Sequence, residues 1–123
     1  MAKFRFEDLQ IWQEAILMAH ELFLIANDLE QKKLWRFADQ IRGAAIGMPN
    51  NISESTASDK LKEQQQFLRY SKRECYESAN MLVILELENH ITKEKKTSLF
   101  NRLDILSRRI QSYSESLVKK SSH

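Results

Sequence analysis

Histidine, cysteine and glutamate are the side chains of this sequence that could hold a metal ion or transfer protons, so their spacing is considered first. A di-metal site in a helical bundle requires a glutamate three residues before a histidine on two helices. Leu17 precedes His20 at that distance and Leu87 precedes His90, so the motif is missing. Helical ribonucleases of the HEPN type carry an arginine a few residues before a histidine. The corresponding positions before His90 are Val83, Ile84 and Leu85. With no glycine-rich phosphate loop either, we predict no catalytic, metal or cofactor site.

Basic side chains offer a second kind of chemistry, which is contact with phosphate groups. Residues 1–59 hold 6 Lys and Arg against 9 Asp and Glu, whereas residues 60–123 hold 13 against 8. A basic half attracts nucleic acid, although ordinary solvated helix surface has the same composition. Aromatic residues are not visibly interleaved with these cations, so the prediction is limited to salt-sensitive contact with an RNA or DNA backbone. The candidate residues are Lys72, Arg73, Arg102, Arg108 and Arg109.

The composition of the 123-residue chain indicates which elements must position these side chains. It has 42% apolar residues but only two glycines and one proline, too few turn formers for an all-β fold. No apolar run is longer than that of Met81–Leu85, which is far shorter than the roughly 20 residues that span a bilayer. The charged start lacks the apolar core of a secretion signal. The single cysteine, Cys75, excludes an internal disulfide and is interpreted as core filler. We expect an all-α protein of the cytoplasm.

Four stretches have the apolar periodicity of helices, at about residues 7–29, 33–56, 59–89 and 92–118. In the fourth, the apolar positions alternate at spacings of 4 and 3, from Leu99 to Leu117. Short polar segments separate the stretches, and no linker divides the chain. The sequence therefore predicts one domain over residues 1–123, an up-down-up-down antiparallel four-helix bundle with left-handed packing.

The first stretch carries two apolar seams, although one is sufficient for the core of a bundle. One seam includes Leu9, Trp12, Ile16 and Phe23, and the second lies roughly 100° away on the helical wheel. We expect the second seam to contact another subunit, and the alternative is a thicker core within one chain. The predicted interface residues are Ile11, Ala15, Met18, Leu22 and Ile25.

The segment IRGAAIGMPNNISES, residues 41–55, contains both glycines and the proline of the chain. Gly43 and Gly47 are four residues apart, so they share one helix face and could let a neighbouring helix approach closely. Pro49 lacks an amide hydrogen and is expected to kink the second helix. Polar side chains that follow, such as Asn51, can bond the freed backbone. An alternative is that the bend presents Asn50, Asn51 and Glu54 to a partner.

Three segments of the chain each carry a characteristic set of residues. The first set is Phe6, Asp8, Leu9, Trp12 and Ala15. The second is Arg42, Ala44, Pro49, Asn51, Ile52 and Glu54, and the third is Phe67 and Glu77. In this order the segments resemble the family of small four-helix proteins encoded in intervening sequences of bacterial 23S rRNA genes. The chain departs from the family pattern at Ser55, where glycine is usual, and at Arg73 and Glu74, which replace a Gly-Ser pair.

The resemblance implies a homo-oligomeric bundle, a pentamer around a central channel. One branch of the family is the accessory protein of diversity-generating retroelements, which binds a reverse transcriptase and nucleic acid. We therefore predict a non-enzymatic oligomeric adaptor with nucleic-acid contact. The alternatives are a pure protein-interaction scaffold and an accessory subunit of a reverse transcriptase. Arg42 and Glu77 have apolar neighbours in the sequence, so we also predict an ion pair between them, joining the second and third helices.

Overall fold

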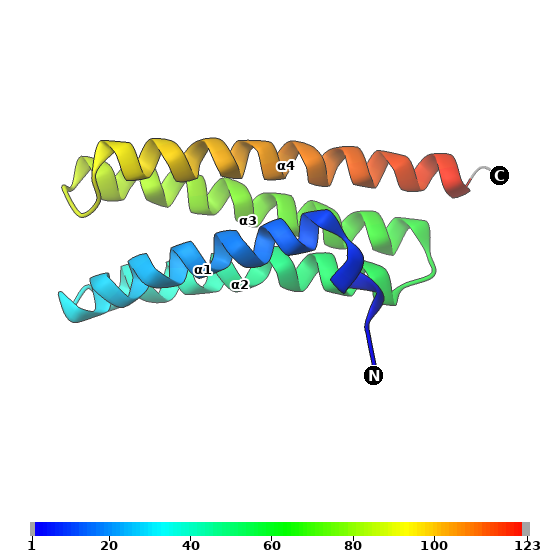
Figure 1. The fold of residues 1–123 in the computed structure, drawn as a ribbon, viewed down its shortest axis with the longest axis horizontal. Helices are drawn as coiled ribbons and strands as arrows, with labels where there is room; N and C mark the ends of the chain where they lie inside the picture. The colour runs from blue at the N-terminus through cyan, green and yellow to red at the C-terminus, as the bar shows by residue number, and fades with distance from the viewer. Residues whose placement is uncertain (1, 122–123) are drawn as a thin grey trace.

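The computed structural model describes residues 2–121, and the regular structure of these residues is entirely helical. A 3₁₀ turn, η1 (Arg5–Asp8), precedes four helices, α1 (Gln10–Gln31), α2 (Trp35–Ala57), α3 (Leu61–Leu87) and α4 (Lys93–Ser121). The chain reverses direction at each of the three connections between them (Figure 1). The prediction of an all-α four-helix bundle is confirmed. The kink near Pro49 stays a prediction, since α2 continues through that residue.

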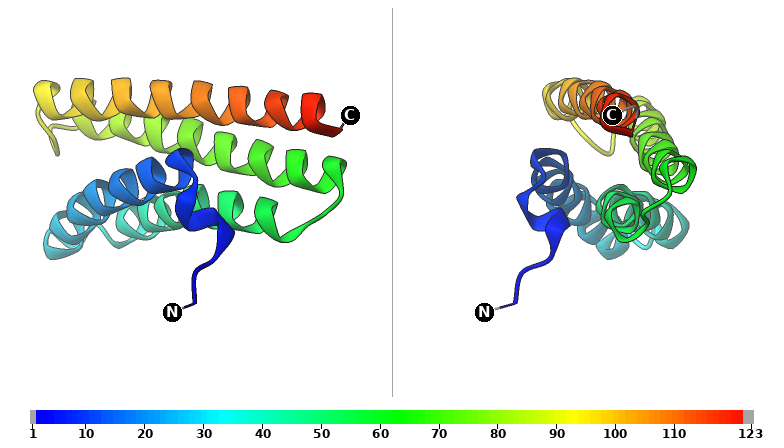
Figure 2. Two further views of the ribbon diagram at one scale, coloured as in Figure 1. Left: turned by 45° about the vertical axis from the view of Figure 1, so that its right-hand side comes forward. Right: turned by 90° about the vertical axis from the view of Figure 1, so that its right-hand side faces the viewer.

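The helices form an open arc when they are seen along their axes (Figure 2). Each helix packs along the next one in the chain, whereas α1 and α4, at the two ends of the arc, meet much less extensively. Ion pairs help to bridge these two helices. Arg109 of α4 pairs with Glu14 of α1, and the Lys95 Nζ atom lies 3.0 Å from a carboxylate oxygen of Glu21.

The hydrophobic core lies inside this arc and includes the seam of α1 that was expected to contact another subunit. Its five side chains, each at most 7% exposed, are Ile11, Ala15, Met18, Leu22 and Ile25. Their assignment to a subunit interface is therefore wrong, because the single chain already buries them. The apolar excess of α1 lies on the other seam, where Trp12 and Phe23 are only partly buried and Ile16 is exposed.

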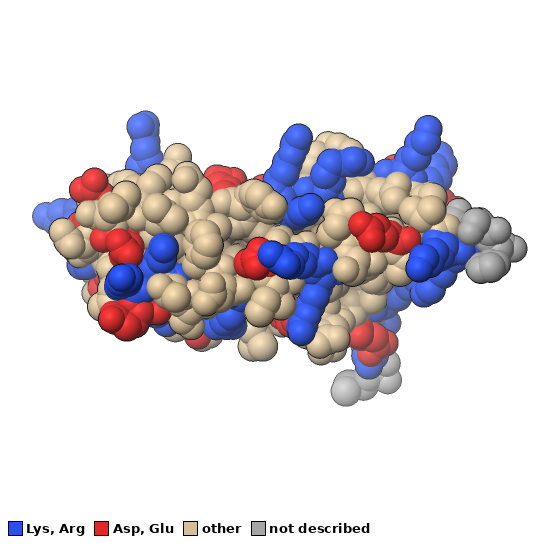
Figure 3. All heavy atoms as spheres, turned by 90° about the horizontal axis from the view of Figure 1, so that it is seen from above, with Lys and Arg blue, Asp and Glu red and all other residues tan. Residues whose placement is uncertain are grey.

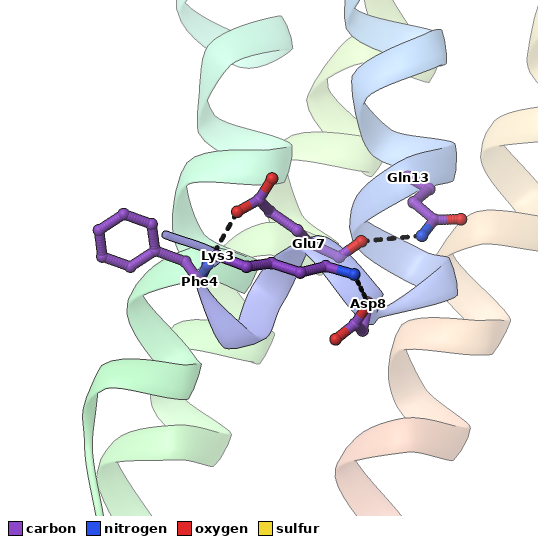
Figure 4. Close-up of polar contacts among 5 residues, drawn as sticks. All are labelled: Lys3, Phe4, Glu7, Asp8 and Gln13. Carbon is purple, nitrogen blue, oxygen red and sulfur yellow. Dashed lines mark hydrogen bonds and ion pairs between the residues drawn. The ribbon is translucent and has the colours of Figure 1, made fainter. Parts of the chain in front are cut away.

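The start of α1 differs from the expected helix at residue 7. Leu9 has an extended backbone, with ψ at 124°, so η1 and α1 are separate elements. Side chains fix this corner (Figure 4). The Phe4 amide donates to a Glu7 carboxylate oxygen at 2.8 Å, and the Gln13 side-chain amide donates to the Glu7 carbonyl at 2.8 Å. An ion pair of 2.7 Å joins Lys3 to Asp8.

Helices α1 and α3 end in the left-handed backbone conformation, with φ of 65° at Lys33 and 63° at Asn89. After each of these residues, an amide bonds back to the last turn: Leu34 to the Leu29 carbonyl at 2.9 Å, and His90 to the Leu85 carbonyl at 2.8 Å. This is the Schellman arrangement, which satisfies free carbonyls at a helix end. It reverses the chain without glycine at two of the three turns, and both glycines of the sequence lie inside α2.

Polar groups surround the proline of α2. Pro49 offers no amide hydrogen to the Ala45 carbonyl. The neighbouring carbonyls receive side-chain donors: Asn51 donates to the Gly47 carbonyl and Ser71, from α3, donates to the Met48 carbonyl, both at 2.8 Å. Ser71 is completely buried, so this bond ties α3 to the middle of α2 inside the core.

The two glycines of α2 have different surroundings. A Cβ atom added at Gly43 would have no neighbour within 4 Å, whereas one at Gly47 would lie 2.8 Å from Cγ of Glu74. Only Gly47 therefore allows α3 to come close, and the expectation of close contact along both glycines is wrong at Gly43.

Gly43→Ala is expected to stabilise the fold by about 0.5–1 kcal/mol, because alanine loses less backbone entropy in a helix. Gly47→Ala is expected to gain less than this or to destabilise the fold, because the Glu74 side chain must move. Urea denaturation of both variants measures the difference. Equal gains in unfolding free energy would contradict the close contact at Gly47.

Candidate nucleic-acid and assembly interfaces

An apolar groove runs between the outer faces of α1 and α2, with η1 at one end. Its lining contains no charged residue: Phe6, Trp12, Ile16, Ala19, Phe23, Ile46, Pro49, Asn50 and Ser53. The rings of Phe6 and Trp12 are 4.9 Å apart, between centroids, and Ile16 is 40% exposed. Interface cores are rich in aromatic residues and poor in charge. The groove therefore has the composition of an association surface.

Two of the motif segments meet in this groove. Trp12 comes from the first segment and Pro49 from the second, and both line it. Asn51 lies just beyond Pro49 and bonds the α2 backbone, while Glu54, one turn further, is exposed. The fold thus brings Trp12, Pro49 and Asn51 to one end of the α1–α2 pair.

A second hollow lies where α1 and α4 diverge. Leu17 and Ile105, which are 61% and 48% exposed, line it together with Met18 and Leu106. Its charged lining residues are Glu14, Arg102 and Arg109. Arg109 is paired with Glu14. The Lys95 ammonium, bonded to Glu21, lowers the pKa of that carboxyl, and Arg102 lowers it further. Arg109 is thus engaged with an acidic group of α1, whereas Arg102 acts on Glu21 through its charge alone.

The other three basic candidates lie on the outer side of α3 and α4. Lys72 and Arg73 are on α3, and the Lys72 ammonium bonds Gln111 of α4 at 3.2 Å. Arg108 is exposed on α4 and bonds Asp104 at 3.3 Å. Figure 3, which views the molecule from the α4 side, shows basic side chains crowding the middle and the C-terminal half of α4, with acidic groups among them. The five candidates therefore divide between two surfaces.

Sequence reasoning missed three residues of this α3–α4 face. Arg69 lines a hollow with Lys72 and Gln111, while Tyr76 and Phe100 line the next hollow along the same two helices. The spacing of Arg69, Lys72, Arg73 and Tyr76 places them on one face of a helix. This spacing is the feature of the sequence that could have identified Arg69 and Tyr76 as part of the face. Phe100 belongs to α4, so only the pairing of the helices brings it near Tyr76.

Arg42 does not pair with Glu77, and that prediction is wrong. Its guanidinium donates to Oδ1 of Asn27 at 2.9 Å and forms an ion pair with Glu30. Both partners lie near the end of α1, which the short turn places beside the start of α2. Glu77 is exposed on α3, where its carboxylate is close to Glu74.

The Glu74 carboxyl is unfavourably placed for a charged group. Burial raises its pKa, and the charge of Glu77 together with a hydrogen bond to it raises the pKa further. In the unfolded chain the carboxyl has its ordinary pKa of 4.5. Above that pH the folded state therefore binds more protons than the unfolded chain does, and stability falls as the pH rises through the window between the two pKa values.

Glu74→Gln is expected to be more stable than the unaltered protein at neutral pH, because it removes the penalty of a partly buried charge beside Glu77. The difference in unfolding free energy should shrink as the pH falls toward 4.5, where the carboxyl of the unfolded chain also becomes protonated. Chemical denaturation at several pH values measures it. A gain that does not change with pH would contradict the electrostatic explanation.

The Cys75 thiol and the acidic and histidine side chains are the remaining groups that could carry chemistry. Cys75 is 1% exposed, and burial raises its pKa to about 12, so the thiol stays protonated and packs in the core. No three His, Cys, Asp or Glu side chains within residues 2–121 are grouped to hold a metal ion. None of the described helices is sufficiently long and apolar to span a membrane.

The helices and surfaces together define a small all-α four-helix-bundle protein. The chain belongs to the family of 23S rRNA-intervening sequence proteins, whose family model matches residues 7–112. The match covers α1, α2 and α3 completely and most of α4. Among curated proteins, none matches the chain.

Proposed function

We propose that this protein is a non-enzymatic, self-associating adaptor of the cytoplasm, with an assembly surface on α1 and a nucleic-acid contact on α3 and α4. The observation that carries the proposal is the separation of two kinds of surface. The groove between α1 and α2 is lined by nine residues without a charge. The face of α3 and α4 instead presents basic side chains and one Asp104–Arg108 pair.

A second copy of the chain is the occupant that we propose for the apolar groove. The α1 helix has an apolar surface on each side: the groove toward α2, and the Leu17–Ile105 hollow toward α4. Two different patches on one molecule suit a head-to-tail contact, and such contacts form a ring when the rotation from one subunit to the next closes. This supports the ring of five subunits that the family resemblance implies.

The nucleic-acid contact is proposed at the cations on the outer face of α3 and α4. Arg69, Lys72 and Arg73 lie within about one helical turn on α3. No ion pair of these three side chains is found among the described residues. They can therefore contact phosphates without breaking an internal bond to a carboxylate. Arg109 contributes less, because it is paired with Glu14 of α1.

Fluorescence anisotropy of labelled RNA and DNA of mixed sequence, measured over a range of salt concentrations, tests this contact. We expect affinity to fall steeply with salt, because each neutralised phosphate releases counterions. If neither nucleic acid binds at low salt, the protein is better described as a pure protein-interaction scaffold. A role as accessory subunit of a reverse transcriptase would require, in addition, a stable complex with such an enzyme.

A further inference from the structure

The α3–α4 face contains a slot between two aromatic side chains. Tyr76 of α3 is 64% exposed, and Phe100 of α4 is 37% exposed. Both line one hollow, whose other lining residues are Cys75, Ala79, Leu103, Asp104 and Ser107. Burial of large aromatic rings is strongly favourable, so two exposed rings beside one hollow leave a surface that a flat apolar group can cover.

Basic side chains lie at both ends of this slot. Lys72 is one helical turn before Tyr76, and Lys96 is one turn before Phe100, with its ammonium 5.0 Å from the ring centroid. Because α3 and α4 are antiparallel, these two lysines lie at opposite ends. The bond from Lys72 to Gln111 fixes the register of the two helices. From Gln111 to Lys96 the length along α4 is about 22 Å, at about 1.5 Å per residue.

The acidic group in the slot does not cancel this charge. Among the described lining residues, only Asp104 is acidic, and it bonds Arg108 of the next helical turn at 3.3 Å. The slot therefore combines two exposed aromatic residues with Lys72 and Lys96 at its ends, and neither lysine forms an ion pair within residues 2–121. Single-stranded nucleic acid has the matching pattern, with flat bases that stack on aromatic rings and phosphates that need cations. In a duplex the base faces are already stacked inside and cannot reach the slot.

We propose that the Tyr76–Phe100 slot binds unpaired nucleobases, and that the protein therefore prefers single strands to duplexes. The inference rests on the proposed nucleic-acid contact of the α3–α4 face and names the form of nucleic acid that this face takes. Lys72 and Lys96 hold the phosphates on either side of the stacked bases. A segment of a few nucleotides spans the distance between them.

Anisotropy titrations with three labelled probes test this inference: a single-stranded RNA, the duplex of the same sequence, and an abasic strand that keeps the phosphates but lacks the bases. The unaltered protein should bind the single strand most tightly. Tyr76→Ala should weaken single-strand binding by at least about fivefold and leave the other two affinities unchanged. Tyr76→Phe retains the ring and should bind like the unaltered protein. Circular dichroism checks that each variant is folded.

The outcomes separate this inference from the proposed function. Salt-sensitive binding that is equal for the single strand and the abasic strand, or that Tyr76→Ala does not change, overturns the stacking site and leaves the phosphate contact standing. Absence of binding to all three probes at low salt overturns both. If Tyr76→Ala changes the sedimentation of the protein and not its nucleic-acid affinity, the slot holds a second copy of the chain, and the inference is wrong.

Discussion

Replacement of Ile16 by glutamate is expected to dissociate the proposed assembly into folded monomers. Ile16 lies in the uncharged groove between α1 and α2 and is 40% exposed in the single chain. In the monomer the new carboxylate remains in water, so the unfolding free energy should change little. In the assembled state it would be buried without a partner, which costs about 3 kcal/mol or more at each interface. That cost lowers the association constant by a factor of about 100 or more.

Sedimentation velocity over a range of protein concentrations measures the effect of Ile16→Glu. The matched control is His20→Glu, which adds a carboxylate at an exposed position of α1 outside the two apolar surfaces. The control should sediment like the unaltered protein. If Ile16→Glu also does so, the groove between α1 and α2 is not where copies of the chain meet.

Reversal of three charges on α3 should have the largest effect on nucleic-acid binding. In the variant Arg69→Glu, Lys72→Glu, Arg73→Glu, the three cations that we propose to contact phosphates become anions that repel them. We expect the affinity for RNA or DNA at low salt to fall by a factor on the order of 100 or more. The slope of affinity against salt should also decrease, by about 0.7 to 0.9 for each phosphate contact that is lost.

A control for this triple variant must have the same change in net charge on a surface away from α3 and α4. Lys32→Glu, Lys33→Glu, Arg36→Glu meets this condition, because these residues lie around the turn between α1 and α2. The control variant should retain most of its affinity and most of its salt slope. Equal losses in the two triple variants would mean that net charge, and not the α3–α4 face, determines binding.

The helices and their order could be predicted from the sequence because amphipathic periodicity is a local property. Four amphipathic stretches joined by short polar segments leave few alternatives to a four-helix bundle. Periodicity also revealed that α1 has more apolar surface than one bundle seam requires. It could not tell which seam faces the core, since that depends on how α2 and α4 are placed. The structure buries the Ile11–Ile25 seam and leaves Ile16 exposed.

Contacts between helices were harder to predict, because the register of one helix against another is not a local property. Arg42 was matched with Glu77 on the basis of their apolar neighbours, whereas the α1–α2 turn supplies Asn27 and Glu30 much closer. The aromatic slot was missed for the same reason. Tyr76 and Phe100 are far apart in sequence, and only the antiparallel packing of α3 on α4 brings them to one hollow.

The most direct test of self-association is the molecular mass of the unaltered protein, measured by sedimentation equilibrium at high micromolar concentration. An assembly joined through α1 predicts a discrete multiple of the 14.5 kDa chain, with a ring of five as the expected form. A mass of one chain that stays constant as the concentration rises would contradict it.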